Sequence, residues 1–289
     1  MPVSPHVKAF FDEPTSNATY VVSEPGGKAC AIIDSVADFD PASACIGSAA
    51  ADRVAAHIDA HGLEVAWILE THVHADHLTA APYLKRRLGG RIGIGACIAD
   101  VQRGFRDIFD TEPGFAADGS QFDRLFADGD ELAIGGLIAR VLHTPGHTPA
   151  CVTYLIGDAA FVGDTLFMPD SGTARADFPG GDARTLYRSI RRILALPAKT
   201  RIFVCHDYGA DGARPVAWET TVAEQRASNK HVRDGIGEEA FVRMREARDA
   251  TLGIPRLILP AIQVNMRAGE LPPQAANGRR YLKIPLGGF

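Results

Sequence analysis

The stretch LETHVHADHLTA at positions 69–80 constrains the chain most, because it places three histidines and one aspartate within six positions directly after the apolar run VAWIL. In an extended segment alternate side chains point the same way, so His72, His74 and Asp76 share one side. His77 follows where the next element begins and can turn back toward the same space. Imidazole and carboxylate ligands suit zinc, iron or manganese, and not calcium. This stretch therefore predicts a metal site.

Three further apolar runs end in residues of the same types, in the segments LHTPGHTPA, FVGDTLF and VCHDYG. They offer His143 and His147, then Asp164, then His206. Because ligand-bearing loops gather at the carboxyl ends of strands in layered α/β proteins, we expect these side chains to join the first cluster. The remaining histidines lie in polar or helical surroundings and are expected at the surface: His6, His57, His61 and His231.

The order of the predicted elements indicates a layered α/β fold. Strands and hairpins are expected at 18–35, 65–69, 91–96, 130–163 and 201–205, with turns at Gly135-Gly136 and Gly157-Asp158. Amphipathic helices are expected at 42–62, at 77–90 with Asp76 as its cap, at 100–109 and at 184–197. We therefore predict two mixed sheets packed face to face with helices outside, an αββα sandwich. Residues 1–215 would form the catalytic domain, with 216–289 as a helical segment and irregular tail packed on it.

The composition excludes several function classes. The 289 residues carry a net charge of −5 with both signs interspersed, so the chain lacks the basic footprint of a nucleic-acid-binding protein. A small anionic ligand would therefore need a local basic pocket. No run is long enough to span a membrane, no signal peptide is recognisable, and the five cysteines are dispersed without a CxxC pair. These features predict a cytoplasmic protein with reduced thiols.

The motifs THVHADH, TPGHT, GDT and CHDY, in this order, resemble those of the metallo-β-lactamase superfamily. That resemblance implies an αββα sandwich with metal at the mouth between its sheets, and it selects His147 rather than His143 as a ligand. The stretches ETHVHADHLTAA, SGTARADFPGGDARTLYRSI, VCHDYG and PAIQVNMRAG further resemble the persulfide dioxygenase (ethylmalonic encephalopathy protein) family. The stretch NGRRYLKIPLG is similar to the longer bacterial members.

This second resemblance implies a dioxygenase that oxidises glutathione persulfide with O₂ and water to sulfite and glutathione, in sulfide detoxification. One Fe(II) per chain would be held by His72, His147 and Asp164, which leaves open positions for O₂ and a sulfur ligand. Four neighbours would orient the ligands and hold water: His74, Asp76, His77 and His206. The partners would be these small molecules, with no nucleic acid and no membrane, and a homodimer is expected only from the family.

Ligand identity alone leaves a second reading open, because every residue of a two-metal hydrolase site is also present. A glyoxalase II-like enzyme would hold two metals, zinc among the candidates, and hydrolyse glutathione thioesters. Ala75 stands where that family has an aromatic residue, and TARADF replaces its Gly-Lys-Phe-Tyr-like run. These departures favour the dioxygenase, in which Arg175 would take over the role of that lysine and bind a glutathione carboxylate, unless it pairs with Asp177. Tyr208 would bind substrate or anchor its own loop. A non-catalytic metal- or persulfide-binding protein is the third reading.

Overall fold

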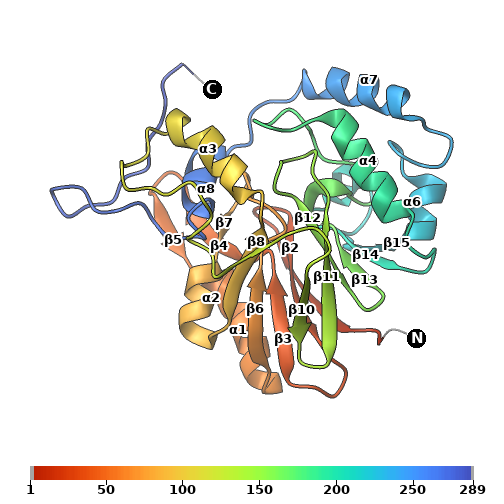
Figure 1. Cartoon of the computed structure of the whole chain (residues 1–289), viewed down its shortest axis with the longest axis horizontal. Coiled ribbons are helices and arrows are strands. Elements are labelled where there is room, and N and C mark those ends of the chain that lie inside the picture. Colours follow the sequence, from red (N-terminus) through yellow and green to blue (C-terminus); the bar gives the residue numbers. More distant parts are fainter. Residues whose placement is uncertain (1–2, 288–289) are drawn as a thin grey trace.

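The computed structural model describes residues 3–287, in which two six-stranded sheets lie face to face between two groups of helices (Figure 1). The first sheet has the order β1-β2-β3-β6-β8-β9. Its strands are His6–Asp12, Asn17–Ser23, Ala29–Ile33, Glu64–Leu69, Arg91–Gly95 and Arg124–Phe126. The second sheet has the order β10-β11-β12-β13-β14-β15. Its strands are Glu131–Ile134, Leu137–His143, Val152–Ile156, Ala159–Phe161, Arg201–Phe203 and Glu219–Thr221.

A small third sheet has the order β5-β4-β7, with the strands Cys45–Gly47, Val36–Asp40 and Leu78–Thr79. Helices α1, α2, α3 and α8 flank the first large sheet, and α4, α6 and α7 flank the second (Figure 1). In chain order the helices are α1 Ala49–His61, α2 Ala81–Leu88, α3 Ile98–Ile108, α4 Ala183–Leu194, α5 Gly209–Gly212, α6 Val222–Ser228, α7 Glu238–Asp249 and α8 Ile258–Asn265. The predicted αββα sandwich is thus confirmed.

The sandwich forms because the strands are apolar on both faces. On β2, Tyr20 and Val22 point into the core between the two sheets, whereas Val21 points to the core under α1, α2, α3 and α8. The same alternation holds on β3, where Ile33 points into the core between the sheets and Ile32 points to the core under the helices. Each fully buried Val or Ile contributes about 1.5–3 kcal/mol to stability. Loops at one end of the sandwich can therefore carry polar groups on a rigid support.

Some predicted elements differ from those observed. The hairpins at Gly135-Gly136 and Gly157-Asp158 are confirmed, since they join β10 to β11 and β12 to β13. The helix expected from position 77 begins only at Ala81, because Leu78–Thr79 pairs with β4 instead. Asp76 therefore does not cap this helix. Instead, the hydroxyl of Thr79 accepts a hydrogen bond from the N–H of Ala81, the first residue of the helix. The expected boundary between residues 215 and 216 stays a prediction.

The expected irregular tail contains helix α8, which packs its apolar side chains on the core under the first sheet. Pro260 lies in the first turn of this helix, where a missing N–H costs no hydrogen bond. At the last turn, the buried amide of Asn265 donates to the carbonyl groups of His74 and His77 at 2.8 Å each. Its oxygen accepts the N–H of Thr79 at 2.9 Å. The tail thus clamps the backbone of the histidine cluster.

This clamp predicts the effect of Asn265→Ala. The substitution leaves three buried backbone groups without partners, so the free energy of unfolding should fall by about 2–4 kcal/mol. Asn277→Ala is the matched control, since Asn277 lies at an exposed turn of the same tail. It should change the free energy by less than about 0.5 kcal/mol in urea titrations. Equal effects of the two substitutions would contradict the clamp.

Candidate metal centre

The candidate ligands come from loops that follow strands of both sheets and meet at one end of the sandwich. His72 follows β6, His147 lies in the loop after β11, Asp164 lies in the short 3₁₀ turn Gly163–Thr165 after β13, and His206 follows β14. Gly163 makes the turn possible, because it has φ +52° and an added Cβ would lie 2.5 Å from the hydroxyl of Thr71. Only glycine fits this close approach.

Three side chains form a compact set. The Nε2 atoms of His72 and His147 lie 3.9 and 3.6 Å from Oδ2 of Asp164. One ligand atom from each of the three lies within 4.8 Å of the others. This is the set that, by the resemblance to persulfide dioxygenases, would hold iron.

In both histidines the other ring nitrogen, Nδ1, lies within hydrogen-bond distance of a protein group. Nδ1 of His147 donates to the carbonyl of Arg175 at 2.8 Å, and Nδ1 of His72 lies 3.0 Å from the hydroxyl of Thr71. That hydroxyl donates to Asp34 at 2.8 Å, so it accepts from His72. Burial, followed by the neighbouring histidines, holds the pKa of His72 well below its usual value. The imidazole is therefore neutral, and its buried Nε2 is left as an unshared metal-binding lone pair.

A second group of ligand atoms adjoins the first. His74, Asp76 and His77 also offer atoms within 4.8 Å of one another. Nε2 of His206 lies 3.2 Å from Oδ2 of Asp76 and 3.4 Å from Oδ1 of Asp164. Asp164 therefore faces both groups, one through each oxygen. Among the described residues, neither ring nitrogen of the buried His77 makes a hydrogen bond, although Nδ1 lies 3.5 Å from Oδ1 of Asp76.

The sequence reasoning missed two buried carboxylates that hold His74. Its Nε2 lies 3.1 Å from Asp34 and 3.4 Å from Glu70. In the part of the chain that the structure describes, its Nδ1 has no hydrogen-bond partner. Burial alone would lower the pKa of His74, but the two carboxylates raise it well above its usual value. Asp34 follows the apolar run of β3, so the strand-end argument could have found it. Glu70 lies within the motif, but only the fold shows what it contacts.

The orphaned nitrogens test whether these residues fit a metal. Buried polar atoms without hydrogen-bond partners are rare in folded proteins. Within residues 3–287, four such atoms lie here: Nε2 of His72, both ring nitrogens of His77, and Nε2 of His206. The side chains of this cluster offer imidazole and carboxylate groups, which are ligands that iron and zinc prefer. The residues therefore fit a bound transition metal.

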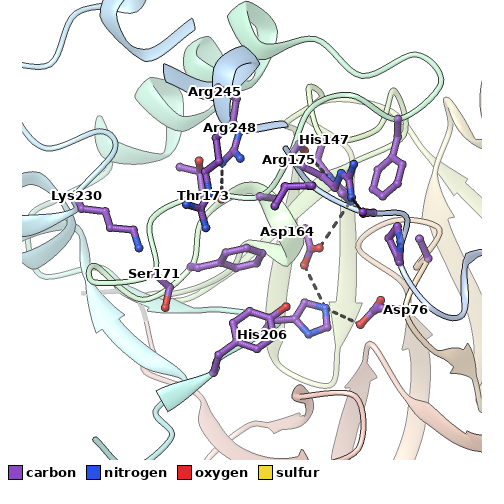
Figure 2. A pocket seen from close by; sticks show the side chains of 18 of the residues that line it. Asp76, His147, Asp164, Ser171, Thr173, Arg175, His206, Lys230, Arg245 and Arg248 are labelled. Atoms are coloured by element: carbon purple, nitrogen blue, oxygen red, sulfur yellow. Dashed lines mark hydrogen bonds and ion pairs between the residues drawn. The ribbon is translucent and has the colours of Figure 1, made fainter. Parts of the chain in front are cut away.

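A cavity of about 490 Å³ opens onto this centre and is lined by Asp76, His147, Asp164 and His206 (Figure 2). Tyr208 also lines it, with 53% of its surface exposed and its ring parallel to that of His206 at 6.3 Å. Among the described residues, its hydroxyl has no hydrogen-bond partner. Tyr208 is thus placed at the cavity, and its contact with substrate stays a prediction.

Four cationic side chains line the same cavity: Arg175, Lys230, Arg245 and Arg248. The guanidinium of Arg175 binds both oxygens of Asp177 and the carbonyl of Gly253, so its predicted contact with substrate would require it to exchange these partners. Arg245 is likewise bound, to Asp249 and to the carbonyl of Thr173.

Lys230 and Arg248 differ from the other two cations. Both are exposed, and within residues 3–287 no hydrogen bond or ion pair involves either charged group. Figure 2 places them on the wall of the cavity away from Asp76. The local basic pocket that an anionic ligand requires is therefore present.

Two other histidines are clearly placed. His143 lies outside the cluster, where its Nε2 bonds the carbonyl of Pro149 at 2.8 Å. The surface position expected for His231 is wrong, because only 8% of this residue is exposed. Its Nδ1 accepts from the backbone N–H of Thr173 at 3.1 Å, in the wall of the cavity. Polar flanking residues hid this tertiary contact.

A family model described as the metallo-beta-lactamase superfamily matches residues 12–206. With the sandwich fold and the ligand set at its mouth, this match over more than half of the chain shows that the chain belongs to the metallo-beta-lactamase superfamily. In residues 3–287, no helix is long and apolar enough to cross a membrane.

Relatives with different names match nearly the whole chain. A "probable metallo-hydrolase" of Burkholderia pseudomallei is 56% identical over 97% of this chain and 98% of its own length. A "beta-lactamase hydrolase-like protein" of Agrobacterium fabrum is also 56% identical, but the chain spans 65% of that relative. "Glyoxylase B2" of Dictyostelium discoideum is 48% identical over 97% of this chain and 96% of its own length.

Persulfide dioxygenases are more distant relatives. The human mitochondrial persulfide dioxygenase ETHE1 is 29% identical over 93% of this chain and 91% of its own length. The crystal structure of ETHE1 from Myxococcus xanthus matches with a TM-score of 0.73 and 28% identity, over 92% of this chain and 100% of that one.

Metal retention tests the ligand set. Asp164→Ala removes the carboxylate that faces both His72 and His147, so we expect the purified protein to lose its metal. His143→Ala is the matched control and should retain wild-type metal content, as measured by plasma mass spectrometry. Metal loss in the His143 variant, or full retention in the Asp164 variant, would show that the ligand set is wrong.

His231 predicts a pH dependence of stability. Burial, with Arg245 as the next cause, lowers its pKa to about 4. Protonation thus favours the unfolded chain, and the stability due to neutral His231 is complete above the unfolded pKa of about 6.5 and is lost as the pH falls toward 4. When the pH is lowered from about 7 to about 4.5, the free energy of unfolding should therefore decrease less for His231→Gln than for the wild-type protein. A His6→Gln control should follow wild type; parallel profiles for all three would contradict the assignment.

Proposed function

We propose that this chain is a persulfide dioxygenase that oxidises glutathione persulfide with O₂ and water to sulfite and glutathione at a single Fe(II). The compact set of His72, His147 and Asp164, facing a cavity with two unpaired cations, carries the proposal. Two histidines and one carboxylate are the ligands of many non-haem iron oxygenases. The likeness to the Myxococcus protein over the full length of its structure supports the choice.

The reaction balances without a further reductant. The terminal sulfur of the persulfide loses four electrons as it becomes sulfite, and O₂ gains four. O₂ supplies two of the oxygen atoms of sulfite, water supplies the third, and two protons are released. Bound between His72, His147 and Asp164, iron(II) would supply the redox chemistry and the open coordination positions.

The residues around the metal set would handle the substrate and the protons. We assign the binding of the carboxylates of the glutathione moiety to Lys230 and Arg248, which line the cavity away from Asp76. Burial disfavours the charged form of His206, but Asp76 and Asp164 outweigh it and raise its pKa. Because Nε2 of His206 lies 3.2 Å from Asp76 and 3.4 Å from Asp164, beside the metal set, we assign to His206 the proton released by the reacting water.

A glyoxalase II-like hydrolase is the second candidate, and it has an observation in its favour. The group His74, Asp76 and His77 could hold a second metal next to the first. Two metals, such as zinc, would suit hydrolysis of a glutathione thioester. The name of the Dictyostelium relative fits this reading.

Paired assays on one preparation separate the two candidates. The protein is loaded anaerobically with Fe(II) or with Zn(II) and given either glutathione persulfide or S-lactoylglutathione. We expect O₂ uptake and sulfite release from the iron form with the persulfide, and little thioester hydrolysis from either form. Rapid thioester hydrolysis without O₂ uptake would overturn the proposal.

The cationic wall predicts a selective effect on substrate binding. Lys230→Gln should raise KM for glutathione persulfide about three- to tenfold with kcat little changed, because the contact is made equally before and during the reaction. Lys199→Gln, an exposed lysine outside the cavity, is the control and should leave KM unchanged. Added salt should raise KM for wild type more than for Lys230→Gln. Identical salt dependence would contradict the contact.

A further inference from the structure

A second cavity, of about 390 Å³, reaches the metal motif from another direction. It lies between the β4–β5 hairpin, the loop after β1 and the start of α8. Its lining shares no residue with that of the substrate cavity. Yet the two cavities are lined by consecutive residues of the motif, Asp76 in the first and His77 in the second.

His77 connects this cavity to the metal set. Its ring is fully buried, and its Nδ1 lies 3.5 Å from Oδ1 of Asp76, whose other oxygen lies 3.2 Å from His206. Apart from this contact with Asp76, nothing within residues 3–287 holds either ring nitrogen of His77 by a hydrogen bond. A buried imidazole that contacts Asp76 on one side thus separates the second cavity from the centre, and small rotations of such a ring can open a path.

The lining of the second cavity suits an uncharged, apolar molecule. Its apolar side chains include Val36, Ala37, Phe39, Ile46 and Leu257. Its aspartates are occupied: Asp38 and Asp40 accept from backbone N–H groups, and Asp12 accepts from Thr15. Apart from Arg256, which is exposed, the lining offers no cation to an anionic thiol. Glutathione persulfide would lose hydration here without gaining partners.

The proposed reaction needs a route for O₂ when the substrate cavity is filled. A cavity of about 490 Å³ lies in the usual size range of small-molecule pockets, which bury most of the surface of their ligand, so a bound substrate would obstruct this route to the metal set. We propose that the second cavity, ending at His77, is the entrance for O₂. This inference rests on the proposed dioxygenase function.

Two substitutions obstruct the entrance at different points. Ile46→Trp covers its mouth, and because 47% of Ile46 is exposed, the larger ring is tolerated. Ala37→Leu fills its interior. Ile138→Trp is the matched control, since Ile138 is 52% exposed on β11 and lines neither cavity.

Steady-state kinetics at varied O₂ give the first readout. Both obstructing variants should raise KM for O₂ about fivefold or more, with KM for glutathione persulfide and iron content as in wild type. The control should match wild type in all three. Unchanged KM for O₂ in both obstructing variants would overturn the inference while leaving the dioxygenase function intact. Absence of O₂ uptake by wild type would instead defeat the proposed function, and the inference with it.

Xenon gives a readout that does not depend on activity. Xenon occupies dry apolar cavities of proteins, as O₂ would. Crystals of the wild-type protein under xenon pressure should show a xenon atom in the second cavity, and Ala37→Leu should remove it. Xenon found only in the substrate cavity would contradict the assignment.

Discussion

The carboxylate of Asp164 is the contact on which the whole site depends. One of its oxygens faces His72 and His147, and the other faces His206. A buried carboxylate among imidazoles is tolerable only if charge and hydrogen bonds compensate its lost hydration, which a shared metal ion would do. The parallel pairing of β13 with β14 places Asp164 and His206 at adjacent strand ends, so the topology of the second sheet fixes this contact.

The first sheet fixes the opposite side of the centre through contacts that are remote in sequence. Asp34 receives hydrogen bonds from the backbone and hydroxyl of Thr71 and lies against His74. Asn265 holds the same loop from the C-terminal helix. Residues far apart in the chain therefore orient the histidines before any metal binds, and such outer contacts tune metal affinity in proteins generally.

Much of this arrangement could be predicted from sequence, because strands have a period of two and carry their polar residues at their ends. That logic brought together His72, Asp164 and His206 with both His143 and His147, and the structure places all of these together except His143. The choice of His147 over His143 came from the family resemblance. It could not foresee partners chosen by tertiary packing. The burial of His231 and the bonds of Asn265 are of this kind, as is helix α8, whose short apolar run lacks a polar face. The pairing of Arg175 with Asp177 was one of two readings that the sequence left open.

The central claim is that one metal, held by two histidines and Asp164, serves this centre. The most direct test is electron paramagnetic resonance of the Fe(II)-loaded protein exposed to nitric oxide, combined with metal analysis. The account predicts about one iron per chain and the half-integer-spin signal of a mononuclear iron–nitrosyl centre. Two metals per chain, with a spin-coupled centre that gives no such signal, would contradict it.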